Sequence, residues 1–170
     1  MTRIPEYDDV IRSVCLTLAA GLALTGAAAA QDDIGTPYVQ AFCVLSSAED
    51  GMGRLYLSSP GLTEAIMKAV AENERLQATA PDEKPPLGDG IPWQSFPDAA
   101  PVCEAGATTA DGDRLIAQVQ YRFPDQPDGD WIDRLVLVKG ADGAYTIDDV
   151  LYGEDGEESL RGVLAEAFAE

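Results

Sequence analysis

The first thirty residues constrain this chain most, because they decide which residues are left to fold and in which compartment. Residues 13–30 are small and apolar, carry no charge and run directly into the polar segment 31–33. The three alanines that end at Ala30 have the small-x-small pattern of a signal-peptidase site. Because two arginines precede the apolar run, the sequence predicts a secretory signal over residues 1–30 that is cleaved after Ala30.

An uncleaved membrane anchor is the alternative for this segment. A membrane-spanning helix needs about 20 apolar residues, and residues 13–30 are slightly fewer and rich in Ala and Gly. In either case residues 31–170 remain to fold, which is the length of one ordinary domain. We therefore expect a single domain over residues 31–170, either periplasmic or secreted.

The predicted domain is strongly acidic. The whole chain has 11 Lys+Arg and 30 Asp+Glu, and residues 1–30 hold two of the arginines and three of the acids, which leaves 9 basic and 27 acidic residues and a net charge of −18. Such a surface repels nucleic acid, whose binding proteins neutralise phosphates with Lys and Arg. We expect membrane contact only if residues 13–30 stay uncleaved. The charge fits a solvated surface, with a basic protein partner or cation binding as alternatives.

The composition also restricts catalysis and indicates a crosslink. The chain has no His, which removes the commonest general base and metal ligand and excludes Ser-His-Asp and Cys-His catalytic sets. Cys15 leaves with the signal, so Cys43 and Cys103 remain. An even pair of cysteines in an exported protein predicts a disulfide, with two unpaired buried thiols as the alternative. We expect no cofactor and no metal site.

The predicted domain divides into a helical first half and a β-rich second half. Thr36-Pro37 predicts the start of one helix and Ser59-Pro60 the start of another, and apolar residues then recur at helical spacing. Residues 80–101 contain six prolines, which exclude a helix or a central strand. From residue 102 the period changes to two, and Asp-Gly turns separate the predicted strands.

This order predicts an α+β fold, in which N-terminal helices pack on a curved antiparallel sheet of about four strands and a C-terminal helix follows. A disulfide between Cys43 in the first helix and Cys103 in the first strand would join the two layers. Trp93 and Phe96 lie in the proline-rich segment. They either pin this long segment to the body of the domain or form a lid over a cavity.

Asp148-Asp149, inside a predicted strand, is the candidate position for a catalytic acid or base. Adjacent residues of a strand point to opposite faces, so if Tyr145, Ile147 and Leu151 face the core, Asp149 does too. Carboxyl groups in such surroundings serve as acids or bases near neutral pH. The alternative is a structural Asp held by helix-end amides or an arginine. Tyr121 is a second candidate, as a hydroxyl donor near Asp149.

Two predicted leading helices, a proline-rich segment and a predicted antiparallel sheet occur together with several short sequence motifs: Gly112-Asp113, segments 119–123, 135–139 and 145–150, and Ser159-Leu160-Arg161. In these features the chain resembles the nuclear transport factor 2-like superfamily. Within the superfamily the chain is similar to a group of small exported bacterial proteins known only as a domain of unknown function. The likeness spans residues 36–168 and implies a cone-shaped α+β fold, a pocket between helices and sheet, and often a dimer through the sheet.

The superfamily includes isomerases and dehydratases that use Asp, Tyr or His in that pocket, and many members that only bind. We therefore predict an exported domain that binds a small ligand or a protein without catalysis, as a monomer or a homodimer. A small lyase or isomerase that uses Asp149 is the first alternative. A periplasmic domain anchored by an uncleaved N-terminal helix is the second.

Overall fold

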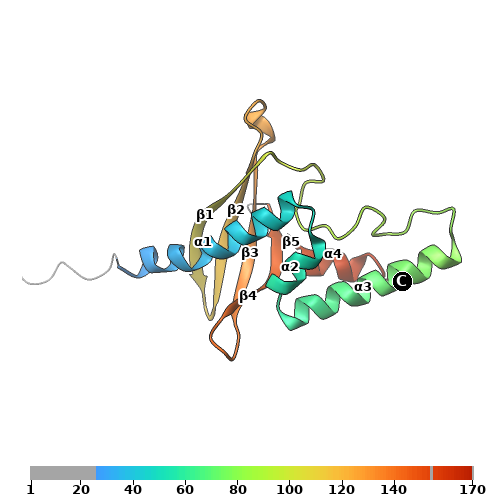
Figure 1. The fold of residues 1–170 in the computed structure, drawn as a ribbon, viewed down its shortest axis with the longest axis horizontal. Helices are drawn as coiled ribbons and strands as arrows, with labels where there is room; N and C mark the ends of the chain where they lie inside the picture. Colours follow the sequence, from blue (N-terminus) through green and yellow to red (C-terminus); the bar gives the residue numbers. More distant parts are fainter. Residues whose placement is uncertain (1–25, 154, 170) are drawn as a thin grey trace, which may run out of the picture.

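The computed structural model describes residues 26–153 and 155–169 and confirms the predicted α+β class (Figure 1). Of the predicted signal, residues 1–25 lie outside the described residues. The helices are α1 (Gly26–Ser47), α2 (Gly51–Leu57), α3 (Pro60–Thr79) and α4 (Leu160–Glu166). The strands are β1 (Val102–Asp111), β2 (Arg114–Arg122), β3 (Trp131–Lys139), β4 (Tyr145–Tyr152) and β5 (Glu158–Ser159).

Helix α1 begins earlier than the sequence predicts. Thr36-Pro37 was expected to open the helix, but the helix begins at Gly26 and Pro37 lies inside it. The four alanines at 27–30 have the highest helix propensity, so the helix extends past Pro37 although the proline cannot donate a backbone hydrogen bond. The predicted cleavage point after Ala30 therefore falls within α1.

The predicted start of α3 is confirmed. Ser59 is its N-cap, and the Ser59 hydroxyl accepts a hydrogen bond from the backbone N–H of Leu62 at 3.0 Å. Pro60 occupies the first turn, where its missing N–H is not needed. The side of α3 that faces the core carries Leu62, Ile66 and Ala69, all of which are buried.

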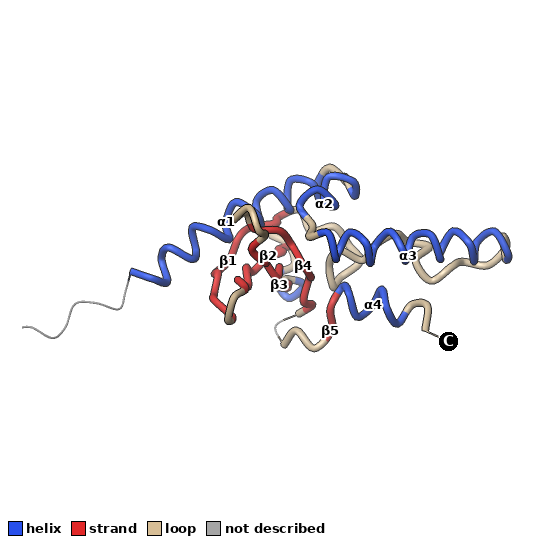
Figure 2. Tube along the Cα trace, turned by 90° about the horizontal axis from the view of Figure 1, so that it is seen from below, coloured by secondary structure: helices blue, strands red, loops and turns tan. Residues whose placement is uncertain are grey.

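The strands form one antiparallel sheet in the order β1-β2-β3-β4-β5. The fifth strand, which was not expected, pairs through only two of its residues with the end of β4. The predicted turn between β1 and β2 is confirmed, since Gly112 has φ 63°, a conformation that glycine adopts without strain. Figure 2 shows α1 lying across one face of the sheet and α3 projecting away from it.

The core lies between the helices and this face of the sheet. Alternate residues of β2 are buried and none of them is more than 5% exposed: Leu115, Ala117, Val119 and Tyr121. Helix α1 contributes Val39 and Phe42, which are 1% and 0% exposed. Side chains from both layers belong to one hydrophobic cluster.

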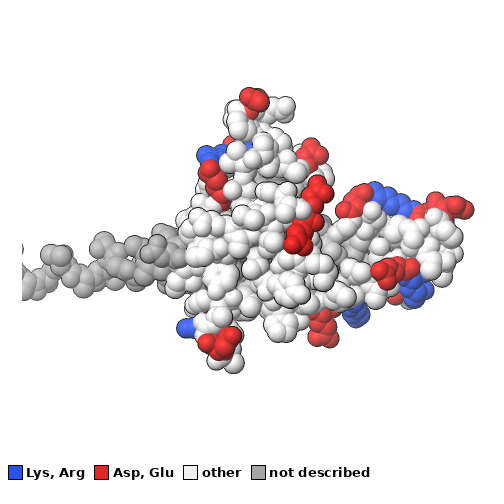
Figure 3. Space-filling model, in the orientation of Figure 1, with Lys and Arg blue, Asp and Glu red and all other residues white. Residues whose placement is uncertain are grey.

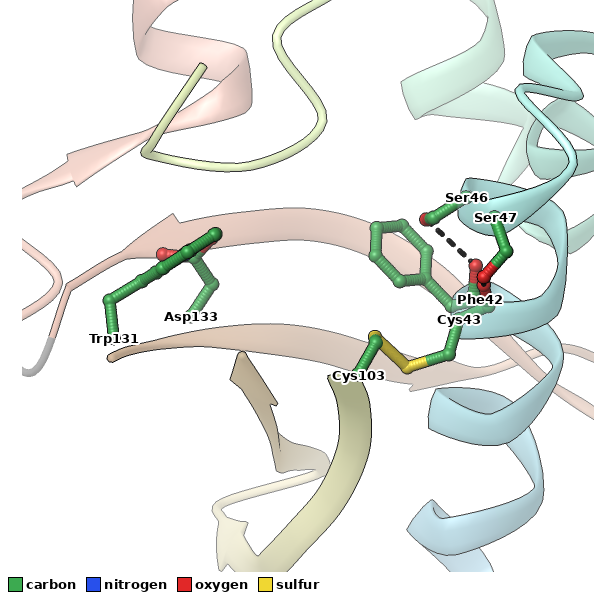
Figure 4. The surroundings of a disulfide bond; sticks show 7 residues. All are labelled: Phe42, Cys43, Ser46, Ser47, Cys103, Trp131 and Asp133. Atoms are coloured by element: carbon green, nitrogen blue, oxygen red, sulfur yellow. Dashed lines mark hydrogen bonds between the residues drawn. A yellow bond between two sulfur atoms is a disulfide. The ribbon is translucent and has the colours of Figure 1, made fainter. Parts of the chain in front are cut away.

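A disulfide bond between Cys43 and Cys103 confirms the predicted crosslink. The two Cα atoms are 5.6 Å apart, a separation that a disulfide bridges without backbone movement. Figure 4 shows the bond spanning the space between α1 and β1, the strand at one edge of the sheet. Within residues 26–153 and 155–169, no helix is both long enough and apolar enough to cross a membrane.

Candidate functional site

Asp149 does not follow the inward direction that alternation in the strand predicts. Val136 pairs with Asp149, but the next residue of β3, Leu137, pairs with Ile147, so Asp148 is an extra residue in β4. A β-bulge of this kind breaks the alternation of a strand. The buried residues of β4 are Ile147, Val150 and Tyr152.

The two adjacent acids hold helices to the sheet. The Oδ1 atom of Asp149 accepts a hydrogen bond from the backbone N–H of Arg161, at the start of α4, at 3.0 Å. The Oδ1 atom of Asp148 accepts hydrogen bonds from the hydroxyl of Ser59 and, at 2.8 Å, from the guanidinium of Arg161. Asp149 therefore occupies the structural position, bonded to a helix-end amide, that the sequence left open as the alternative.

Tyr121 and Asp149 lie at different places on the sheet. Tyr121 pairs with Trp131, whereas Asp149 pairs with Val136, five residues further along β3. At about 3.3 Å per residue this is roughly 17 Å. The structure does not bring together the two catalytic candidates that the sequence indicated.

A buried carboxylate that the sequence reasoning missed lies next to Tyr121. Asp133 on β3 is 0% exposed. It accepts hydrogen bonds from the backbone N–H groups of Ser95 at 2.9 Å and Gly153 at 3.1 Å, and from the indole N–H of Trp131 at 3.3 Å. Figure 4 shows Asp133 and Trp131 side by side on β3. The sequence signal that could have revealed Asp133 is its position, an even number of residues from buried apolar residues of β3, which places it on the same face of the strand.

Tyr121 is buried without a partner for its hydroxyl. It is 2% exposed, and its ring stacks on that of Trp131 with centroids 4.4 Å apart. Within the described part of the chain, the hydroxyl has no hydrogen-bond partner. Burial is the main cause that raises the pKa of Tyr121 far above its ordinary value, and the charge of Asp133 adds to it. The hydroxyl is therefore protonated and can donate a hydrogen bond.

Arg54 on α2 is a second partly buried polar residue, in the helical layer. Its Nε atom is buried and has no hydrogen-bond partner in the described ranges. None of the ion pairs among the described residues includes it. Burial lowers the pKa of Arg54, and the charges of Tyr121 and Asp50 partly offset this effect. The Tyr121 hydroxyl and the Arg54 Nε are thus two buried polar groups without a hydrogen-bond partner among the described residues.

Trp93 and Phe96, the two possible lid residues, differ in their surroundings. Trp93 is 4% exposed, its ring packs edge-on against Phe42, and it lies 5.2 Å from the guanidinium carbon of Arg54. Phe96 is 46% exposed and contacts the ring of Trp131, with centroids 5.3 Å apart. Trp93 therefore packs into the core, whereas Phe96 lies at the surface on Trp131.

Two open hollows lie on the surface around this cluster. One, of about 310 Å³, is lined by residues of β2 and β3 that include Tyr121 and Trp131. The other, of about 320 Å³, is lined by Ser95, Tyr152 and several acids that follow β4. In the part of the chain described by the structure, no group of three His, Cys, Asp or Glu is placed to hold a metal ion.

The outer side of α1 and α2 is a second candidate site. Val44, Met52 and Tyr56 are 67%, 64% and 87% exposed. Residues 34–48 contain no charged residue, and the one charged residue of α2, Arg54, is only partly exposed. In the view of Figure 3, few charged side chains cover α1, whereas they gather around α3 and at the ends of the hairpins. We call Val44, Met52 and Tyr56 with their surroundings the uncharged surface.

Comparisons with protein-family models, with curated proteins and with solved structures find no match to this chain.

Proposed function

We propose that this chain is an exported domain that works by binding another protein through the uncharged surface on α1 and α2, without catalysis. The observation that carries the proposal is the exposure of Val44, Met52 and Tyr56 in a chain whose net charge is −19. The centres of protein interfaces are depleted in charged residues and enriched in Met and aromatic side chains. The uncharged surface has this composition.

The partner is a protein with an apolar patch that basic residues surround. Glu49 and Asp50 are exposed at the turn between α1 and α2, beside the uncharged surface. Opposite charges around an apolar contact speed association and select the partner. A second copy of the chain is equally acidic, so the charges of the two copies repel one another.

The interior supports binding over catalysis. Asp149 holds the start of α4, and Asp133 already accepts three hydrogen bonds. No contact of the described residues favours Asp149 as the base of a lyase or isomerase. The resemblance to the nuclear transport factor 2-like superfamily stays a prediction.

Export is part of the proposal. Disulfides form and persist in oxidising compartments, so the Cys43–Cys103 bond supports a periplasmic or secreted location. Cleavage after Ala30 rests on the small, apolar composition of residues 13–30. Retention of this segment as an anchor is the remaining alternative, and the mass of the intact protein distinguishes the two.

Photo-crosslinking tests the surface directly. A photoreactive residue replaces Tyr56 in cells that make the protein, and a matched control carries it at Ala141, an exposed residue of the turn between β3 and β4. We expect one discrete product from position 56 alone, with a lower yield in the Met52→Lys variant and at high salt.

Three outcomes contradict the proposal. A product with twice the mass of the chain means self-association rather than a basic partner. Equal products from Tyr56 and Ala141 mean that the contact is not specific to the uncharged surface. A yield that changes with neither Met52→Lys nor salt means that neither the apolar contact nor the surrounding charge matters.

A further inference from the structure

Three aromatic side chains form a continuous surface at one end of β2 and β3. Phe123 follows β2, Trp131 begins β3, and Phe96 belongs to the proline-rich segment. The ring of Trp131 contacts both phenyl rings, with its centroid 5.3 Å from that of Phe96 and 5.9 Å from that of Phe123. Phe96 is 46% exposed, and the other two side chains are partly exposed. We call these three residues the aromatic surface.

An open hollow lies beside the aromatic surface. This hollow, of about 310 Å³, is lined by Trp131 and Asp130 together with neighbouring residues of β2 and β3. On its other side, Trp131 stacks on Tyr121 and its indole N–H donates a hydrogen bond to Asp133 at 3.3 Å. These contacts hold the ring in one orientation, and a ring that is already ordered loses little conformational entropy when a ligand binds.

Residues 94–98 form a turn that carries Phe96 and an acid. The side-chain amide of Gln94 donates hydrogen bonds to the backbone carbonyls of Phe96 at 2.7 Å and Asp98 at 2.9 Å. Asp98 is exposed and joins none of the ion pairs among the described residues. The same turn therefore holds an exposed phenyl ring and an unpaired negative charge.

The loop between β2 and β3 places further acids beside Phe123. The backbone N–H of Phe123 donates a hydrogen bond to the carboxylate of Asp130 at 2.8 Å, and a Cβ atom at Gly129 would lie 3.6 Å from the Phe123 ring. Asp128, which precedes Gly129, is exposed. Within the described ranges, neither Asp128 nor Asp130 belongs to an ion pair.

The charge around the aromatic surface is therefore negative. Residues 90–101 contain one Asp and residues 123–133 contain four, and neither segment contains a Lys or an Arg. The charge of Arg122, which precedes Phe123, is already paired with Glu104. In Figure 3 the tip of the hairpin of β2 and β3, at the top of the view, carries acidic side chains. Such a surface attracts cations and repels anions.

Exposed aromatic rings in a negative field match one class of ligand. The face of an aromatic ring attracts a cation, and quaternary ammonium groups are the cations that clusters of aromatic rings bind in other proteins. A primary ammonium is strongly hydrated, so it gains less from contact with rings. A quaternary ammonium has methyl groups in place of N–H groups and can lie directly on the rings.

We propose that the aromatic surface is a binding site for a small, free quaternary ammonium cation. The methyl groups of the ligand contact Phe96, Phe123 and Trp131, and the surrounding acids attract its charge. The same acids repel the phosphate of a choline lipid, so the ligand is a free cation rather than a lipid headgroup. The aromatic surface is separate from the uncharged surface on α1 and α2, so either proposal can fail without the other.

Calorimetric titration of the oxidised full chain with choline tests the site. The matched control ligand is the neutral analogue of choline in which carbon replaces the charged nitrogen. We expect choline to bind at least about tenfold more tightly than this analogue, because only choline carries the charge. Ethanolamine, a primary ammonium of the same charge, should bind more weakly than choline, and vesicles of phosphatidylcholine should not bind the chain.

Two variants test the rings themselves. Phe96→Leu and Phe123→Leu keep an apolar side chain but remove a ring, and each should weaken choline binding by about threefold. The matched variant Tyr56→Leu removes a ring that is 87% exposed on α2 and should leave the affinity unchanged. Asp128→Asn should weaken choline binding and reduce its dependence on salt. Circular dichroism shows whether each variant is folded.

The proposal is overturned if choline does not bind, or if its neutral analogue or ethanolamine binds as tightly as choline does. Unchanged affinity in both Phe96→Leu and Phe123→Leu also overturns it. Binding to phosphatidylcholine vesicles without binding to free choline would assign the aromatic surface to a membrane instead.

Discussion

Removal of the Asp133 side chain tests how the proline-rich segment is joined to the sheet. Asp133 is 0% exposed and accepts hydrogen bonds from Ser95, Gly153 and Trp131. Asp133→Ala leaves three N–H groups without their acceptor. These hydrogen bonds are only part-buried, so each unpaired group is expected to cost about 1 kcal/mol, the lower end of the range for a buried group. We expect the free energy of unfolding to fall by about 3 kcal/mol, a large share of the total of about 5–15 kcal/mol for a domain.

Asp133→Asn separates the shape of the side chain from its acceptors. Ser95 and Trp131 both donate to Oδ2, whereas Gly153 donates to Oδ1. If the amide places its oxygen at the Oδ2 position, two of the three hydrogen bonds survive and only the one from Gly153 is lost. The expected loss is about 1 kcal/mol, because the Gly153 N–H is only part-buried, so the Asn variant lies between the native chain and the Ala variant.

Urea denaturation of the oxidised chain, followed by circular dichroism, measures these differences. Asp130→Ala is the matched control, because Asp130 is exposed and accepts one hydrogen bond, from the N–H of Phe123 at 2.8 Å. We expect the control to lose no more than about 1 kcal/mol. If Asp133→Ala loses no more than Asp130→Ala, the reasoning from buried donors is wrong. An Asn variant less stable than the Ala variant would also contradict it.

Two further predictions concern the crosslink and the buried tyrosines. Cys43→Ser removes the disulfide between two residues with a sequence separation of 60, so the chain-entropy estimate is a loss of about 4 kcal/mol in the free energy of unfolding. We expect a lower melting temperature without reductant, and an unchanged melting temperature refutes this. Burial is the main cause that raises the pKa of Tyr121 and Tyr152 above the ordinary value of 10.0. The contribution of these two tyrosines to stability is therefore complete below pH 10 and is lost as the pH rises toward the folded-state pKa. The melting temperature should therefore fall above pH 10, less steeply in Tyr121→Phe than in Tyr56→Phe, and equal slopes in these two variants would contradict the assignment.

The parts of the fold that the sequence predicted correctly depend on local signals. Alternation at period two and the turn at Gly112 are sufficient to define the hairpin of β1 and β2. The Ser59-Pro60 pair is sufficient to define the start of α3. The start of α1 was missed because Pro37 was given more weight than the alanines before it.

The site was predicted less well because its determinants are not local. The bulge at Asp148 arises from the pairing of β4 with β3, and nothing in the sequence of β4 alone reveals it. Two of the donors to Asp133 come from residues 38 and 20 positions away. Whether a single acid in an apolar strand has hydrogen-bond donors around it therefore cannot be recognised before the tertiary structure is known.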